Sequence, residues 1–345
     1  MTSRWCIAAA MALLLTIAIR CAFAQAPPPF DWTTPPSYHT AVVKPPPFGS
    51  DDQGKALDLY DQSVAVLIIQ GAYSNEDQFF EDVHAAAEKS AALLTGTLEN
   101  LGFEVFVWRD LKSTTMRHTL DDIFDRFGGA PRSRLFFYYF GHSYSTGTAN
   151  DPLARTYLVP VDSVNPVTWP EEFRHRAPLI DVLVEGARHA TVEHAFFAIE
   201  ACRAGAVIDD LKQSTLAPPL PHPDGWIRSV EAREQVRQFI TSGNRMQQVP
   251  ANNTFTTLLN AALLDNGAIA PDDYYLTGSA VMRYISQRLK QTAPEYKLDP
   301  QPGKWPPGSN GEFLFRRVTP DVKTFVDYKI FTVASGLVRD RKSVV

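Results

Sequence analysis

Short runs of continuous apolar residues recur along the middle of the chain. They lie at 63–70, 103–108, 135–140, 194–199 and 238–242. Runs that stay apolar, instead of alternating with polar residues, are typical of strands buried on both faces of a parallel sheet. Two shorter segments, 156–162 and 312–315, are also predicted to be extended.

Segments with apolar residues at three-to-four spacing separate these runs. This spacing indicates helices with one buried face. They are predicted at 76–100, from a cap at Thr114 to 127, and at 177–189, 254–264 and 278–291. A repeated strand–helix order predicts an α/β fold, in which a mainly parallel sheet has helices on both faces.

The N-terminal segment has the pattern of a secretory signal. Arg4 precedes an apolar stretch at 7–19, and Ala22-Phe23-Ala24 resembles a cleavage site. We therefore expect residues 1–24 to be removed from an exported, periplasmic or secreted protein with no stable membrane insertion. Arg20 is unusual in such a signal and leaves an uncleaved anchor as the alternative.

Proline marks the boundary of the folded part. Residues 25–57 are Pro-rich and are predicted to be an extended spacer. The globular domain is placed at 58–317, with a large part to about 205, a polar loop at 206–236 and a small part at 237–317. Residues 318–345 form a C-terminal extension.

Composition excludes several classes of function. The 345 residues are 45% hydrophobic and 21% charged, with a formal net charge of −5. No run of basic residues indicates a nucleic-acid partner. The chain has no phosphate-binding loop, no dinucleotide fingerprint and no zinc-peptidase motif.

Two residues whose side chains can act in catalysis follow predicted strands. His142 follows the run at 135–140, and Cys202 follows the run at 194–199. Cys202 is also the only one of three cysteines left once residues 1–24 are removed. If the two strands are neighbours in the sheet, their ends lie about 5 Å apart, and a thiol and an imidazole would share one crevice. The simpler alternative is that Cys202 is a buried core residue.

The segments around these two residues resemble the caspase, metacaspase and paracaspase family. Residues Phe137-Tyr-Tyr-Phe-Gly-His142-Ser resemble its strand and Gly-His-Gly signature, and Glu200-Ala-Cys202-Arg-Ala-Gly its Asp-Ala-Cys-Arg-Ser-Gly signature. The resemblance covers about 62–316. It implies a three-layer αβα sandwich around a mainly parallel six-stranded sheet.

The resemblance also implies a function and a role for each matching residue. The activity would be hydrolysis of peptide or protein substrates by a cysteine endopeptidase, after Arg or Lys. Cys202 would be the nucleophile and His142 the general base and acid, while the N–H groups of Ser143 and Cys202 would hold the oxyanion. Glu200 would be an acid of the first specificity pocket, S1. No cofactor is expected to be required, and calcium dependence stays open.

The sequence departs from the family pattern at three positions. Ser143 replaces the Gly that follows the histidine, Ser90 stands where a second S1 acid is expected, and Glu200 replaces Asp. Glu88 and Asp82 are the candidate substitutes for the missing acid. If basic specificity holds, the loop at 206–236 offers self-cleavage points, which are Lys212, Arg228 and Arg233.

Two other functions remain open on the sequence alone. The segment 141–145, Gly-His-Ser-Tyr-Ser, is a near match to the elbow that presents a serine nucleophile, which would make Ser143 the attacking group of a serine hydrolase. The departures at Ser143 and Ser90 favour instead a weakly active or inactive binding module on the same fold.

Overall fold

The computed structural model describes most residues between 32 and 339. The described ranges are 32–40, 47–48, 57–74, 78–147, 151, 154–209, 211, 226–229, 231–264, 267–269, 275–292, 294–316, 330–333 and 336–339. The chain divides into a short unit, Met1–Pro35, and a main unit, Pro36–Val345, that holds every element below. The expected signal at 1–24 lies outside the described residues.

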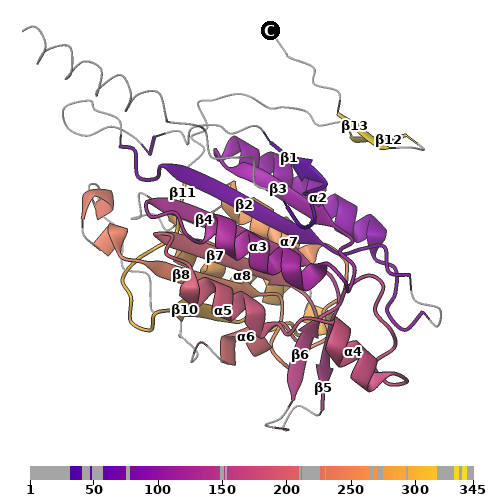
Figure 1. Ribbon diagram of the computed structural model, residues 1–345. Coiled ribbons are helices and arrows are strands. Elements are labelled where there is room, and N and C mark those ends of the chain that lie inside the picture. The colour runs from indigo at the N-terminus through magenta and orange to yellow at the C-terminus, as the bar shows by residue number, and fades with distance from the viewer. Residues whose placement is uncertain are drawn as a thin grey trace, which may run out of the picture. The chain divides into compact units, whose positions relative to one another are not determined.

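A seven-stranded sheet with the order β1-β3-β2-β4-β7-β8-β10 forms the centre of the main unit (Figure 1). In that order the strands are Tyr38–His39, Glu104–Arg109, Gln62–Ile69, Ser133–Phe140, His194–Glu200, Val236–Thr241 and Pro302–Trp305. The five inner strands run parallel, and the two edge strands, β1 and β10, are antiparallel to their neighbours. The mainly parallel α/β fold expected from the apolar runs is confirmed.

Helices cover both faces of this sheet. They are α2 His84–Asn100, α3 Met116–Phe127, α4 Pro170–Arg176, α5 Asp181–His189, α6 Ala206–Asp209, α7 Thr254–Leu263 and α8 Gly278–Thr292. Figure 1 shows α3 and α5 on the near face of the sheet and α7 and α8 on the far face. No helix in the described part of the chain is long and apolar enough to cross a membrane.

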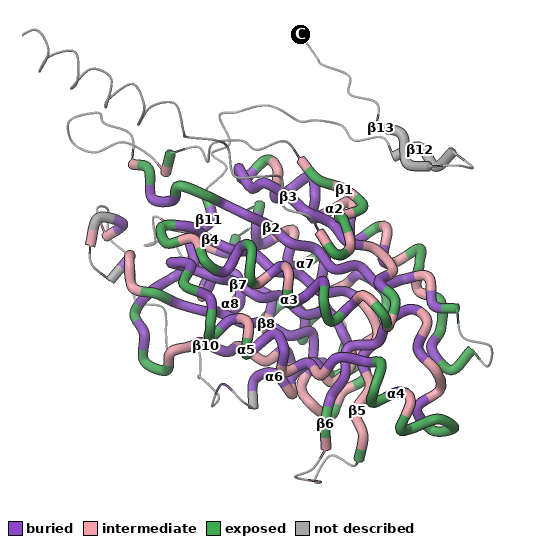
Figure 2. The backbone as a smooth tube through the Cα atoms, viewed as in Figure 1, coloured by how far each residue is buried: buried purple, intermediate pink, exposed green. Residues whose placement is uncertain are grey.

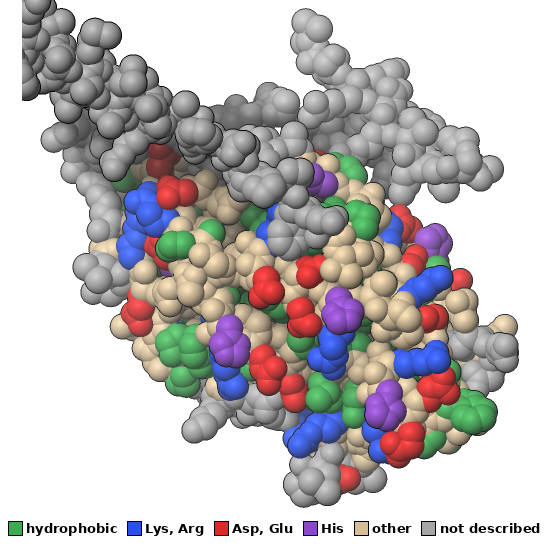
Figure 3. Space-filling model, in the orientation of Figure 1, with side chains coloured by type: hydrophobic (Ala, Val, Ile, Leu, Met, Phe, Trp, Pro, Cys, Tyr) green, Lys and Arg blue, Asp and Glu red, His purple; other side chains and the backbone are tan. Residues whose placement is uncertain are grey.

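The inner strands are buried on both sides because both sheet faces carry helices (Figure 2). In β4, Phe136 and Tyr138 join the core cluster formed with α2, α7 and α8. The alternate residue Phe137 stacks against Phe124 of α3. This two-sided burial explains why the strands are apolar runs rather than alternating ones. On the surface of the molecule that faces the viewer, acidic, basic and histidine side chains are mixed, without a large patch of one charge (Figure 3).

Several short elements complete the main unit. The hairpin β5–β6 pairs Ser143–Thr146 with Arg155–Leu158. Two further pairs lie outside the main sheet: β9 Leu276–Thr277 with β11 Leu314–Phe315, and β12 Ile330–Val333 with β13 Gly336–Arg339. One-turn 3-10 helices lie at Trp226–Arg228, Glu231–Arg233 and Pro294–Tyr296.

The expected number of six strands is wrong, because both edges of the sheet were missed. Strand β1 is only two residues long and falls within the expected Pro-rich spacer. Strand β10 begins with Pro302 and Gly303, which are poor strand signals. The expected strand at 312–315 does form in part, but its β11 pairs with β9 rather than with the main sheet.

Three helix boundaries also differ from those expected from the sequence. Helix α2 starts at His84 rather than near 76, and Phe80 packs instead against the ring of His142. Thr114 is not the cap of α3, whose N-cap is Thr115 without a side-chain cap bond. The helix expected at 177–189 forms only from Asp181 onward, as α5, because Ala177 is extended and precedes Pro178. Helix α4, at Pro170–Arg176, lies before this range and was not predicted.

The expected loop at 206–236 is only partly irregular. It begins with α6 and ends with the two 3-10 helices at Trp226–Arg228 and Glu231–Arg233. Lys212 lies outside the described residues. Arg233 is held in place, since its guanidinium donates to the carbonyl oxygen of Leu59 and pairs with Glu193.

Candidate active site

The carboxyl ends of β4 and β7 lie next to each other in the sheet. The strands are parallel neighbours in register, and Phe140 at the end of β4 lies opposite Glu200 at the end of β7. His142 and Cys202 each follow two residues after these ends. Both line one cavity of about 170 Å³, here called the dyad cavity. The expectation that neighbouring strand ends bring the two side chains into one crevice is therefore met by the geometry.

Gly141 allows the chain to leave β4 through a crowded space. A Cβ atom there would lie 2.7 Å from Cβ of Gln70 and 2.8 Å from the hydroxyl oxygen of Tyr73. Its φ of 156° is also one that side chains rarely adopt. A glycine before His142 is therefore required by space and by backbone geometry.

The backbone and ring of His142 are both held by neighbours. Its N–H donates to the hydroxyl of Tyr73 at 2.8 Å, and its carbonyl accepts from the hydroxyl of Tyr139 at 2.9 Å. The ring packs against Tyr73 and Phe80, at centroid distances of 4.6 and 5.6 Å. Nε2 lies 2.9 Å from the carbonyl oxygen of Glu81. These contacts fix the direction of the imidazole.

The contact with Glu81 also determines which ring nitrogen can act as a base. A carbonyl oxygen only accepts hydrogen bonds, so Nε2 of His142 carries the proton and Nδ1 holds the lone pair. Burial lowers the pKa of His142 below its usual value, although the contact with Glu81 opposes this shift. The ring is therefore neutral at pH 7 and ready to accept a proton at Nδ1.

Cys202 is partly exposed and is the free thiol of the described chain. Its Sγ accepts from the N–H of Val249 at 3.3 Å and lies 3.6 Å from the carbonyl oxygen of Val249. Burial raises the pKa of the thiol, while the contact with Val249 and the positive charge of Arg203 lower it in part. The sulfur is therefore protonated at neutral pH, and its reactivity depends on a base.

Ser143 ties the two strand ends together. It begins β5, is buried, and its hydroxyl donates to the carbonyl oxygen of Cys202. This contact joins the segment after His142 to the segment after β7. The serine-nucleophile alternative fits poorly, because an elbow requires a helix directly after the serine and residues Ser143–Thr146 form a strand.

Glu200 lies at the edge of the dyad cavity and is almost fully buried. Oε2 accepts a hydrogen bond from the hydroxyl of Tyr138 at 2.8 Å and another from the hydroxyl of Thr256. Oε1 is buried and has no hydrogen-bond partner among the described residues. Burial raises the pKa of Glu200 to about 7. The carboxyl group therefore has an unused acceptor and a free energy cost of ionisation that a cation could offset.

Ser90 belongs to the same hydrogen-bonded cluster as Glu200. Its Oγ lies 3.1 Å from Oγ1 of Thr256, and it accepts from the side-chain amide of Asn253 at 2.6 Å. The hydroxyl of Thr256 thus links the two residues expected to form S1. Ser90 itself is fully buried and does not line the dyad cavity, which only Glu200 of the two reaches.

Neither candidate substitute for the second acid joins this cluster. Glu88 forms an ion pair with Arg109, with Oε1 2.8 Å from Nε. Asp82 accepts from the backbone N–H of His84 at 2.7 Å, at the start of α2. Neither Glu88 nor Asp82 lines the dyad cavity, whose acidic residues in the described chain are Glu200 and Glu81.

Several contributors to the site were not expected from the sequence. Glu81 and Val249 act through backbone groups, which leave no signal in residue type. Tyr73 is an aromatic residue in a loop and gave no pattern. Thr256 offered a weak signal, since it is a polar residue on the buried face of α7, between Phe255 and Leu259.

Comparison with known proteins agrees with this geometry. No curated protein matches the chain. The model of the caspase domain family matches residues 62–300, which is most of the chain and spans both strand ends. The chain belongs to the caspase domain family, whose members are typically cysteine peptidases.

Proposed function

We propose that this protein is a cysteine endopeptidase that cuts after Arg or Lys. The observation that carries the proposal is one cavity lined by Cys202, His142 and Glu200 together. A thiol, a neutral imidazole and a buried acid are the groups needed to attack a peptide bond next to a basic side chain. The family match supports the reaction class.

The proposed reaction starts with proton transfer from Cys202 to Nδ1 of His142. The two side chains do not hydrogen-bond to each other in the described structure, and such contacts often tighten only when substrate binds. The thiolate then attacks the scissile carbonyl carbon, and the N–H groups of Ser143 and Cys202 would stabilise the oxyanion. His142 gives its proton to the leaving amine.

The acyl-enzyme is then hydrolysed by the same base. A thioester now joins the substrate's acyl part to Sγ of Cys202, and His142 removes a proton from an incoming water. Hydroxide attack releases the new carboxyl terminus, and the proton returns to the sulfur. In this reaction the carbonyl of Glu81 would hold Nε2–H throughout and leave Nδ1 free to exchange the proton.

Glu200 is the proposed recognition group for the basic side chain. An arriving guanidinium or ammonium would pair with its unused Oε1 and stabilise the ionised form, which lowers the raised pKa. Substrate binding would thus be coupled to loss of a proton from Glu200.

Kinetics on peptide amides ending in Arg, Lys, Asp or Ala test the proposal. Cys202→Ala and His142→Ala should each lose at least about a thousandfold in kcat/KM. Glu200→Gln should lose about a hundredfold on Arg and Lys and little on Ala, because only a charged partner is removed. Glu171→Gln, a substitution of an exposed acid on α4, is the matched control.

Two outcomes would contradict this function. Activity lost in Ser143→Ala but retained in Cys202→Ala would indicate a serine hydrolase. If wild type turns over no peptide, while iodoacetamide still labels a folded protein at Cys202, the chain is a caspase-fold binding module instead.

A further inference from the structure

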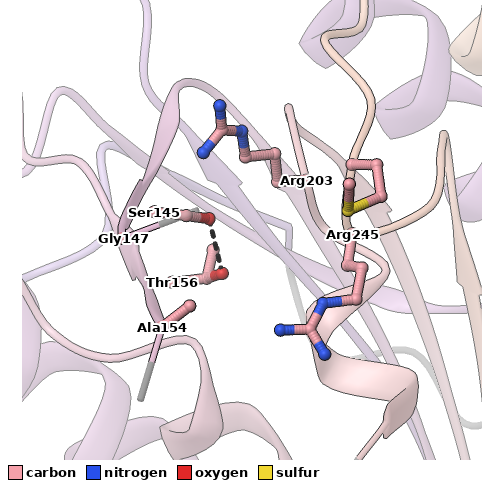
Figure 4. Close-up of a pocket in the computed structure, with 7 residues that line it drawn as sticks. Ser145, Gly147, Ala154, Thr156, Arg203 and Arg245 are labelled. Atoms are coloured by element: carbon pink, nitrogen blue, oxygen red, sulfur yellow. Dashed lines mark hydrogen bonds between the residues drawn. The ribbon is translucent and has the colours of Figure 1, made fainter. Parts of the chain in front are cut away.

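A second cavity lies beside the dyad cavity, between the β5–β6 hairpin and the loop after β8. Its volume is about 240 Å³, compared with about 170 Å³ for the dyad cavity. Arg203, Arg245 and the hydroxyl groups of Ser145 and Thr156, which lie 2.8 Å apart, are among the groups that line it (Figure 4). We call it the arginine cavity.

The charge of the arginine cavity is opposite to that of the dyad cavity. Two arginines line it, and none of the described residues that line it is acidic. The carboxylate of Asp151 lies next to Gly147 on the hairpin side, so among the described residues there are two basic groups and one acidic group. The dyad cavity, by contrast, contains the buried Glu200. A ligand spanning both cavities would carry a positive group at one end and a negative group at the other.

The backbone holds the two arginines in fixed relation to the nucleophile. Arg203 directly follows Cys202 and has a left-handed φ of 55°. Its N–H donates to the carbonyl oxygen of Gln247 at 2.7 Å, in the same loop as Arg245. This loop continues to Val249, which contacts Sγ of Cys202. The same two segments therefore line both cavities. Cys202 and Val249 line the dyad cavity, and Arg203 and Arg245 line the arginine cavity.

The direction of a bound peptide follows from this arrangement. If a basic side chain occupies the Glu200 side, its carbonyl carbon lies at Cys202. The chain beyond the scissile bond must then leave on the other side of Cys202, where Arg203 and the hairpin lie. An extended chain advances about 3.3 Å per residue, so one of the first two residues after the bond reaches the arginine cavity.

We propose that the arginine cavity is a specificity subsite that binds an Asp or Glu side chain on the leaving-group side of the scissile bond. The proposal rests on the peptidase function above. Guanidinium groups bind carboxylates through paired, charge-assisted hydrogen bonds, and the hydroxyl groups of Ser145 and Thr156 can donate to the same oxygens. The preferred cleavage sequence is thus a basic residue followed by an acidic one.

Three internally quenched peptides test the subsite. All have Arg before the bond, and they carry Glu, Gln or Lys at both of the next two positions. Wild type should cleave the Glu peptide about three to ten times faster than the Gln peptide, with Lys slowest, since these partly exposed pairs are worth modest free energies. Arg245→Glu should reverse the order of Glu and Lys, and Arg203→Gln should weaken the preference.

Arg117→Glu, the same charge change on the exposed face of α3, should leave the order unchanged. Arg245→Gln is the milder variant if Arg245→Glu does not fold. A second readout does not need catalysis: fluorescence anisotropy measures binding of the same peptides to the Cys202→Ala protein.

The two readouts separate the subsite from the peptidase function. Cleavage without any preference for Glu overturns the subsite and leaves the peptidase intact. Absence of cleavage, with Glu-preferring binding that the added substitution Arg245→Glu reverses, supports the subsite and overturns the peptidase. No preference in either readout overturns the subsite.

Discussion

At the scale of single residues, protonation states dominate the chemistry of this site. Burial lowers the pKa of His142 and raises that of Cys202, so both are neutral at pH 7. In the proposed reaction, the thiolate and imidazolium would therefore form only when the proton is transferred. Glu200 differs from both, because its pKa of about 7 means that it changes charge within the physiological pH range.

The raised pKa of Glu200 predicts a dependence of stability on pH. The folded chain keeps a proton that the unfolded chain releases near pH 4.5, so this residue's contribution to stability falls as pH rises from about 4.5 to about 7. The total loss is about 3 kcal/mol. Glu200→Gln should therefore gain stability relative to wild type by this amount between pH 4.5 and pH 8.

Urea denaturation across this pH range measures the effect. Glu171→Gln, whose carboxylate is exposed on α4, should show no comparable gain. A free-energy difference between Glu200→Gln and wild type that is the same at every pH would contradict the raised pKa.

At the scale of elements, the site depends on how strands end and on which loops return to them. Strands β4 and β7 present His142 and Cys202, but the loop before α2 supplies the carbonyl of Glu81, and the loop after β8 supplies Val249. Helix α7 places Thr256 against Glu200. These five segments thus meet at the carboxyl ends of β4 and β7.

The end of β4 can be tested through its glycine. Gly141→Ala should lower the free energy of unfolding by about 1–3 kcal/mol, because the added methyl group overlaps with Gln70 and Tyr73. It should also reduce cleavage strongly, since His142 moves with the strand end. Chemical denaturation and kcat/KM on an Arg amide measure both effects.

The matched control is Gly129→Ala, where a Cβ atom would meet only the carbonyl oxygen of Asp125 at 3.9 Å. If Gly141→Ala is as stable and as active as this control, the close packing at the end of β4 is not required for function.

At the scale of the whole molecule, one sheet continues across the connection between the large and small parts. Strands β7 and β8 are parallel and in register over six residue pairs, from His194 opposite Val236 to Ile199 opposite Thr241. The segment joining them crosses 210–225, which contributes none of these pairs. Integrity of the sheet therefore does not depend on an unbroken chain there.

We expect a cut in this connection to leave the molecule assembled. Prolonged incubation of wild type should cut it at Lys212 or Arg228 rather than at Arg233, which Glu193 and Leu59 hold in place. The two pieces should separate on a denaturing gel but elute together in gel filtration. Strand pairing and a shared core hold them.

The Cys202→Ala protein should stay intact under the same conditions, and brief trypsin treatment of it should give the same co-eluting pieces. An intact wild-type chain after incubation would contradict self-cleavage, and separation of the trypsin pieces in gel filtration would contradict the continuous sheet.

The sequence by itself determined most of the order of the elements and the two residues proposed to react. Apolar runs and helical periodicity are local patterns, so the inner strands and most helices were predictable from them. His142 and Cys202 could be found because both directly follow such runs, and parallel neighbours place their carboxyl ends together. The acid Glu200 was identified through the family resemblance, from its position two residues before Cys202.

Only the tertiary structure decided what surrounds these residues. The short edge strands β1 and β10 carry almost no local signal and exist because they pair with β3 and β8. The carbonyl of Glu81 and the pKa of Glu200 depend on contacts and burial, to which residues distant in sequence contribute. The arginine cavity likewise requires the hairpin and the loop after β8 to meet, which no single segment specifies.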